Sequence, residues 1–238
     1  MKIIRKKLLE MLGHSLKITV IFFMLCLSAK ADDPGPAVWM EPYSYLALGD
    51  SYTIGEGVPS HQRWPVQLVR ALRNHVPVHR PKIIATTGWT TDELLGAVSS
   101  INMNRKYDLV SLLIGVNNQY RGYPLHYFRE EFPKLLDIAI HLARGKRKRV
   151  FVVSIPNYAA TPFGRRGDPR KITRELKYYN RIAREICRKK GVRFINITDI
   201  SERTGSSLVA HDDLHPSGKM YSLWVRRIYP EVKRMLAR

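Results

Sequence analysis

Short runs of apolar residues alternate with longer stretches of helical periodicity from residue 43 to residue 238. The five runs are rich in β-branched residues and lack polar alternation, which is typical of strands buried on both faces of a parallel sheet. They cover residues 45–48, 83–85, 109–114, 150–155 and 192–197. The sequence therefore predicts five strands within an α/β fold.

The segments between these runs carry apolar residues three and four positions apart, the pattern of helices with one buried face. The clearest stripes begin at Trp64, Leu125, Ile172 and Met220. Pro133 is a candidate break in the second stripe, and we expect Pro230 to kink or end the last one. The alternation predicts a parallel sheet covered by helices on both faces, in a single domain over residues 43–238, with ligands at the carboxyl ends of the strands.

The first 31 residues have the layout of a secretory signal peptide. A basic stretch ending at Lys17 precedes twelve largely apolar residues, 18–29, and a small-x-small cleavage site ends at Ala31. A membrane anchor is the alternative, but twelve helical residues reach only about 18 Å, short of a ~30 Å hydrocarbon core. We therefore expect cleavage after Ala31, export to the periplasm or beyond, and an extended, Pro-rich lead-in over residues 32–42.

The whole chain has 40 Lys and Arg against 20 Asp and Glu, a formal charge of +20. Removing residues 1–31 takes away six basic residues and one acidic residue and leaves +15. The densest basic run, 144–149, is explained either as a solvated connection or as a site attracted to an anionic membrane surface. Nucleic acid is not an expected partner, because the chain is exported and no aromatic stacking stripe accompanies its basic residues.

The cysteine pattern argues against disulfide and zinc chemistry. Cys26 lies in the predicted signal, so Cys187 would be the one thiol left, and no zinc-ligand spacing occurs in the sequence. Cys187 lies on an apolar helical stripe, which predicts a core position. We expect no metal and no organic cofactor.

Candidate catalytic groups follow the first three predicted strands. Ser51, after Gly49 and Asp50, could present a nucleophilic hydroxyl, although Asp and Ser are also favoured at helix N-caps. Gly88 could turn its N–H toward a ligand or simply form a turn. Asn117 could donate its amide to a developing oxyanion, or serve as a turn former.

A second candidate cluster lies near the C-terminus. Asp212 and His215 are three residues apart, which lets the carboxylate reach the imidazole Nδ1 and leaves Nε2 for a serine. Pro216 restricts His215 to extended backbone geometry. His211 and Asp213 are the competing imidazole and carboxylate, and the spacing favours Asp212 with His215. The alternative is a polar loop that caps the next helix.

In this order, the Ser, Gly, Asn and Asp-x-x-His motifs resemble the SGNH or GDSL-type hydrolases, from residue 45 to about residue 225. The resemblance implies a three-layer α/β/α sandwich with a five-stranded, parallel, flavodoxin-like sheet. One position departs from the family pattern. The third motif usually reads G-x-N-D, and here Asn118 replaces the aspartate, which concerns the local geometry of that loop.

The resemblance also implies an ester hydrolase that works through an acyl-enzyme. Ser51 would be the nucleophile, His215 the general base and Asp212 the group that orients His215. The oxyanion hole would be formed by the N–H groups of Ser51 and Gly88 and by the side-chain amide of Asn117.

The substrate is predicted from two loops, 119–123 and 156–166, which carry aromatic residues and arginine. Tyr120, Tyr158 and Phe163 are the candidate substrate-binding residues, although Tyr158 and Phe163 would equally pin a long loop. The combination suits an ester with a short or medium acyl chain and a polar or anionic alcohol part, such as a lysophospholipid or an acyl-glycan. A carbohydrate O-acetylesterase is the alternative, and a non-catalytic module that binds anionic ligands is a remote one.

Overall fold

The computed structural model describes residues 41–100, 104–203 and 205–237, which lie in one compact unit. The signal peptide predicted over residues 1–31 and most of the lead-in predicted over 32–42 lie outside the described residues. All five predicted strands are confirmed, with ends shifted by at most two residues. They are β1 (Tyr45–Gly49), β2 (Lys82–Ala85), β3 (Leu109–Leu113), β4 (Val150–Val153) and β5 (Arg193–Ile195).

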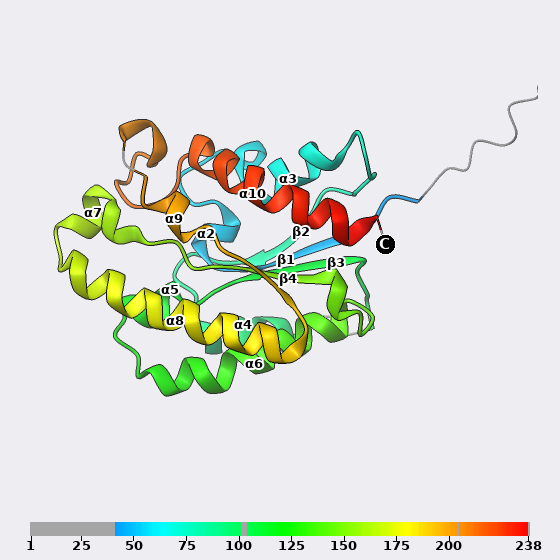
Figure 1. The fold of residues 1–238 in the computed structure, drawn as a ribbon, viewed down its shortest axis with the longest axis horizontal. Helices are drawn as coiled ribbons and strands as arrows, with labels where there is room; N and C mark the ends of the chain where they lie inside the picture. The colour runs from blue at the N-terminus through cyan, green and yellow to red at the C-terminus, as the bar shows by residue number, and fades with distance from the viewer. Residues whose placement is uncertain (1–40, 101–103, 204, 238) are drawn as a thin grey trace, which may run out of the picture. The chain divides into compact units, whose positions relative to one another are not determined.

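The strands form one parallel sheet in the order β2-β1-β3-β4-β5, which is the flavodoxin-like order (Figure 1). Helices α3 (Trp64–Leu72) and α10 (Gly218–Leu236) pack together on one face of the sheet. Helices α4 (Thr91–Ser99), α6 (Leu125–Leu142) and α8 (Pro169–Lys190) cover the other face. The predicted three-layer α/β/α sandwich is therefore confirmed.

Short helical segments connect these elements, most of them near the carboxyl ends of the strands. The α-helical ones are α2 (Ser51–Ile54), α5 (Val116–Tyr120), α7 (Pro162–Arg165) and α9 (Thr198–Ser201). The 3₁₀ turns are η1 (Ser60–Gln62), η2 (Arg147–Arg149), η3 (Tyr158–Ala160) and η4 (Ser206–Leu208). None of the described helices has the length and apolarity needed to cross a membrane.

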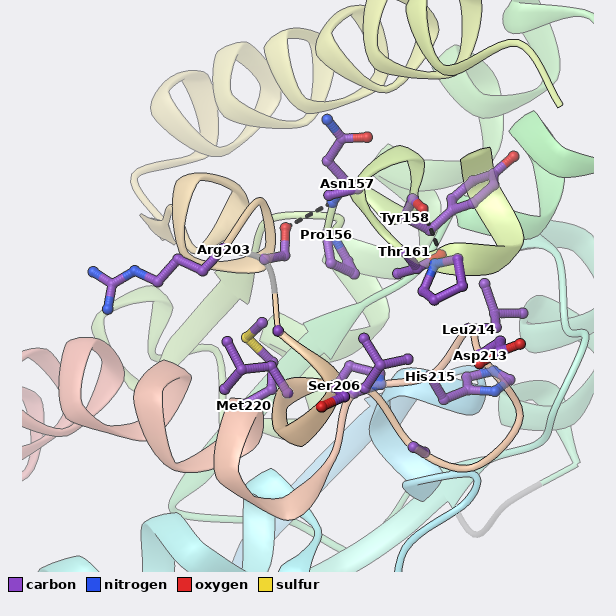
Figure 2. Close-up of a pocket in the computed structure, with 18 of the residues that line it drawn as sticks. Pro156, Asn157, Tyr158, Thr161, Arg203, Ser206, Asp213, Leu214, His215 and Met220 are labelled. Atoms are coloured by element: carbon purple, nitrogen blue, oxygen red, sulfur yellow. Dashed lines mark hydrogen bonds between the residues drawn. The ribbon is translucent and has the colours of Figure 1, made fainter. Parts of the chain in front are cut away.

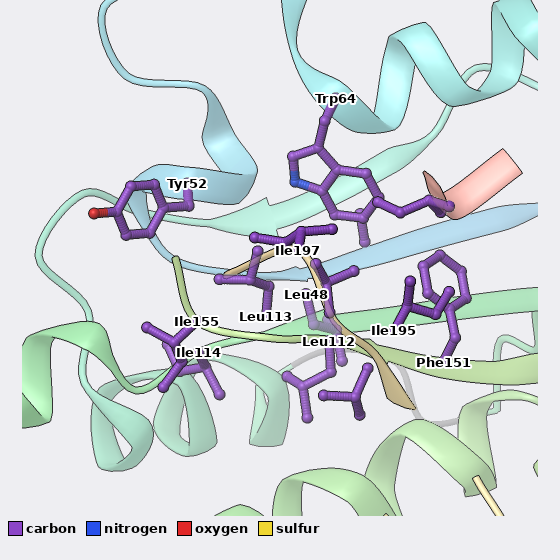
Figure 3. Close-up of a cluster of buried hydrophobic side chains, with 14 of the residues drawn as sticks. Leu48, Tyr52, Trp64, Leu112, Leu113, Ile114, Phe151, Ile155, Ile195 and Ile197 are labelled. Carbon is purple, nitrogen blue, oxygen red and sulfur yellow. The ribbon is translucent and has the colours of Figure 1, made fainter. Parts of the chain in front are cut away.

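The central strands are buried along their whole length, as their unbroken apolar runs predict. Leu48 and Leu112 belong to the cluster of apolar side chains at the sheet (Figure 3). Trp64 of α3 lies with its ring 6.3 Å from that of Phe151. Full burial of each such side chain contributes about 1.5–3 kcal/mol. Cys187 is also fully buried, as predicted, and burial raises the pKa of its thiol to about 12.

Both prolines lie inside continuous helices, so of the two outcomes expected at Pro230, a kink or an end, the end is wrong. Helix α10 continues beyond Pro230 to Leu236, and α6 is not split at Pro133. A proline in a helix interior costs about 3 kcal/mol. The buried side chains on both sides of each proline outweigh this cost, because ending α10 early would expose Val232 and Leu236.

The three strands that precede the predicted site end at the same level of the sheet. Gly49 of β1 lies opposite Ala85 of β2 and Leu113 of β3. Residues that follow these strands therefore start from one edge of the sheet, where ligands of parallel α/β sheets bind.

Candidate active site

Ser51 lies two residues beyond the end of β1, at the first position of α2. Asp50 takes the N-cap position that the sequence also allowed for Ser51, and its Oδ1 accepts the Tyr52 N–H at 3.0 Å. Gly49 has no room for a side chain, because a Cβ there would lie 2.3 Å from Thr53 Oγ1. The backbone of Gly49 therefore packs directly against α2, which begins with Ser51.

Asp50 is fully buried, and its Oδ2 has no hydrogen-bond partner among the described residues. Burial raises the pKa of this carboxyl to about 8, against the opposing effect of the Tyr52 N–H. The Asp50 carboxyl is therefore mainly protonated at neutral pH.

Asp212 and His215 form a close pair in the loop before α10. Asp212 Oδ2 lies 2.5 Å from His215 Nδ1, while its Oδ1 accepts the backbone N–H groups of Leu214 at 3.0 Å and His215 at 2.9 Å. Burial raises the pKa of the Asp212 carboxyl, but the hydrogen bonds from the His215 ring and the two N–H groups outweigh it and lower the pKa. An ionised Asp212 holds the proton on Nδ1 and leaves Nε2 as the acceptor.

The competing residues of this loop lie elsewhere. Asp213 has its carboxylate 2.6 Å from Arg166 Nη2, in a largely exposed ion pair. Its backbone has a φ of 64°, which turns the chain between Asp212 and His215. His211 is exposed. The structure thus brings Asp212, and not Asp213, to the imidazole of His215.

Ser51 and His215 line the same cavity of about 240 Å³, together with Gly88 and Asn117. The Ser51 hydroxyl makes no hydrogen bond to any other described residue, and the Tyr52 ring lies edge-on to the His215 ring at 5.8 Å. Hydrogen bonds between a catalytic serine and its base are often long before substrate binds. The two groups therefore line one cavity without a hydrogen bond between them.

Three donors face this part of the sheet edge. Among the described residues, the backbone N–H groups of Ser51 and Gly88 have no hydrogen-bond acceptor. Asn117, in the first turn of α5, donates from Nδ2 to the Trp89 carbonyl oxygen at 2.9 Å, which fixes the amide and leaves its second N–H free. Gly88 has a φ of 89°, a conformation that favours glycine.

Two residues support the loops that carry these donors, and sequence reasoning gave neither of them this specific role. Arg121 Nη2 donates to the Gly88 carbonyl oxygen at 2.7 Å and so fixes the Gly88–Trp89 peptide, which follows the donor N–H of Gly88. Fully buried Asn118 accepts the Thr91 N–H at 3.1 Å and donates to Thr91 Oγ1 at 2.7 Å, and that hydroxyl donates to Glu131. Asn118 was visible in the sequence as a departure from the family pattern, but nothing in the spacing pointed to Thr91 or Glu131.

The three predicted substrate-binding aromatics meet at the mouth of the cavity. Tyr120 is 58% exposed, and its ring lies 6.3 Å from Tyr158 and 6.0 Å from Phe163. All three residues line the cavity with Ser51. The buried Tyr158 also donates its hydroxyl to Gln119 Oε1 at 3.0 Å, so it joins the two loops as well as lining the cavity.

Comparisons with known proteins identify the family of this chain and similar folds. The family model of the GDSL-like Lipase/Acylhydrolase family matches residues 47–223. The crystal structure of TesA is similar with a TM-score of 0.65 and 17% identity, covering 81% of this chain and 99% of TesA. A lipase/acylhydrolase from Enterococcus faecalis is similar with a TM-score of 0.63 and 22% identity, covering 82% of this chain and 97% of that protein. The acetylxylan esterase Axe2 from Geobacillus stearothermophilus is similar with a TM-score of 0.57 and 19% identity, covering 80% of this chain and 94% of Axe2.

Proposed function

Because the chain belongs to the GDSL-like lipase/acylhydrolase family, we propose that it hydrolyses carboxylic esters through an acyl-enzyme on Ser51. The supporting observation is the convergence on one cavity of Ser51, the His215 imidazole paired to Asp212, and N–H donors without acceptors. A structural loop would not need this combination.

In the first half-reaction, Ser51 Oγ attacks the ester carbonyl carbon while His215 Nε2 accepts the hydroxyl proton. The carbonyl oxygen gains negative charge and is bound by the N–H groups of Ser51 and Gly88 and the free N–H of Asn117. Collapse of this tetrahedral intermediate breaks the bond to the alcohol oxygen, which takes the proton from His215. The products are the free alcohol and the Ser51 acyl ester.

In the second half-reaction, His215 accepts a proton from water, and the resulting hydroxide attacks the acyl carbonyl carbon. The intermediate collapses to a carboxylic acid, and the proton on His215 returns to Ser51 Oγ. Asp212 stabilises the imidazolium in both halves. The scheme uses only groups of this chain and water.

The acyl group we propose is short or medium in length. Tyr120, Tyr158 and Phe163 form an aromatic wall beside Ser51, and the cavity of about 240 Å³ is too small for a long chain to be fully enclosed. A carbohydrate O-acetylesterase is the second candidate, since one structural neighbour is an acetylxylan esterase.

The test is the hydrolysis of p-nitrophenyl esters from acetate to palmitate by the wild type, by Ser51→Ala and by Ser60→Ala. Ser60 is an exposed serine in η1 and serves as the matched control. We expect turnover by the wild type and by Ser60→Ala, and none by a folded Ser51→Ala. A steep preference for acetate would favour the O-acetylesterase. Equal turnover by Ser51→Ala, or no turnover by the folded wild type on any ester, would refute the proposal.

A further inference from the structure

A second cavity, of about 350 Å³, adjoins His215 (Figure 2). Its walls come from the segment that follows β4, from η4, and from the first turn of α10. Representative lining residues are Pro156, Thr161, Arg165, Ser206, Leu208 and Met220. Four residues, including His215 and Tyr158, line both this cavity and the one that contains Ser51. The two spaces therefore meet at the imidazole.

The direction of proton transfer assigns a different part of the substrate to each space. His215 must give its proton to the departing alcohol oxygen, so the alcohol part of the ester leaves from the His215 side. The carbonyl oxygen must point toward the N–H groups of Ser51 and Gly88, which places the acyl chain on the side of Tyr120 and Phe163. The second cavity, which is lined by His215 and not by Ser51, is then the space that the alcohol part can enter.

Resting on the proposed esterase activity, we propose that this second cavity binds the alcohol part of the substrate and that Arg165 selects an anionic alcohol. A volume of about 350 Å³ equals that of about a dozen liquid waters, which accommodates a group of the size of glycerol phosphate or one acidic sugar. Leu208 and Met220 supply a buried apolar wall for the carbon skeleton.

The charges around the cavity single out Arg165. Within the described part of the chain, its side chain makes no hydrogen bond or ion pair, although it lines the cavity. The acidic lining residue, Asp213, is already paired with Arg166 at 2.6 Å. Arg203 also lines the cavity, but its guanidinium extends away from His215 (Figure 2) and its charge acts on Asp199. Arg165 is thus the cation left to meet an anionic group.

The first experiment compares butyryl esters of glycerol phosphate, glycerol and choline, whose alcohol parts are anionic, neutral and cationic. We expect kcat/KM to fall in that order. Arg165→Gln should lower the ratio of the anionic to the neutral ester by about three- to fivefold, the effect of one partly solvated charge contact. Arg170→Gln, which removes an exposed cation at the start of α8, should leave the ratio unchanged. A ratio insensitive to Arg165→Gln would overturn the assignment.

The second experiment tests the space rather than the charge. Ser206 is an exposed residue that lines the cavity, so Ser206→Trp should fill it without disturbing the core. We expect this variant to lose turnover of glyceryl butyrate while keeping that of methyl butyrate, whose alcohol part needs no cavity. Equal loss or equal retention of both activities would place the alcohol elsewhere. Failure of the esterase proposal is distinguishable, because the wild type would then hydrolyse neither ester.

Discussion

Replacing Asn118 by aspartate, the usual residue of the family pattern, should destabilise this chain. Asn118 is fully buried and makes two bonds to Thr91, accepting its N–H at 3.1 Å and donating to its Oγ1 at 2.7 Å. The Thr91 hydroxyl has one hydrogen, and it already goes to Glu131. A carboxylate at position 118 keeps the first bond but turns the second into two oxygens that face each other without a proton.

The magnitude follows from the lost bond and the buried charge. Loss of one hydrogen bond costs about 1 kcal/mol, and a buried acceptor without a donor adds about 1–3 kcal/mol. We expect Asn118→Asp to lower the free energy of unfolding by about 3 kcal/mol at pH 8, or the Tm by about 6–12 °C for a domain of this size. Burial raises the pKa of the new carboxyl above its unfolded value. The loss should therefore shrink as the pH falls from the raised folded pKa toward the unfolded pKa of about 3.9.

Urea unfolding at pH 8 and pH 5 measures the effect, and a second substitution tests its cause. In Asn118→Asp combined with Glu131→Gln, the Thr91 hydroxyl can donate to the new carboxylate and accept from the new amide, so the network is complete in reverse. We expect the double variant to recover more than half of the lost stability. A stable single variant at pH 8, or a double variant with no recovery, would refute this account of the loop.

Four further predictions address the site and the surface. Asp212→Ala should lower kcat by about 10³-fold or more in steady-state ester hydrolysis, whereas Asp213→Ala should have little effect; equal losses would reassign the carboxylate. Asn117→Ala should lower kcat by about 10²–10³-fold with a smaller change in KM, and a pure KM effect would move its amide to substrate binding. Because the pKa of Asp50 is raised to about 8, folding takes up a proton between about pH 4 and pH 8, and the free energy of unfolding falls as the pH rises through this range. Urea unfolding at several pH values should show that Asp50→Asn removes this pH dependence, and an unchanged dependence would contradict a buried, protonated Asp50. Lys148→Glu should weaken cosedimentation with anionic vesicles by about 1 kcal/mol per unit of charge changed, with zwitterionic vesicles as the control, and unchanged binding would exclude the run 144–149 as a contact.

The sheet was predictable from sequence because its signal is local. Each central strand is an unbroken apolar run whose burial on both faces follows from helices on both sides of the sheet. The end of α10 was not predictable, because the local penalty of Pro230 is offset by Val232 and Leu236, whose contacts are distant in sequence. The local cost of proline favours ending α10 at Pro230, whereas the burial of Val232 and Leu236 favours continuing it. The burial contribution is the larger of the two, so the helix continues.

The site divides along the same line. The Asp212–His215 pair was predictable because the two residues are only three positions apart in one loop, a spacing that lets the carboxylate reach the imidazole ring. The support of the donor loop was not, because Arg121 reaches Gly88 across 33 positions of sequence and Asn118 reaches Thr91 across 27. The sequence thus predicts candidate reacting groups, while the residues that support their loops become visible only when the loops are placed together.

The basic run, residues 144–149, and the candidate active site lie at opposite ends of the strands, the run at the amino end of β4 and the site at the carboxyl end. Helix turn η2, Arg147–Arg149, leads directly into β4, and the segment that contains Tyr158 follows the other end of that strand. The four residues of β4 separate the two edges by about 13 Å of extended chain. An anionic surface that binds Lys148 and its neighbours would therefore meet the edge remote from Ser51. If residues 144–149 bound an anionic surface, the cavity that contains Ser51 would open away from that surface. Its substrate would then come from solution or from a second surface opposite, and not from the surface that is bound.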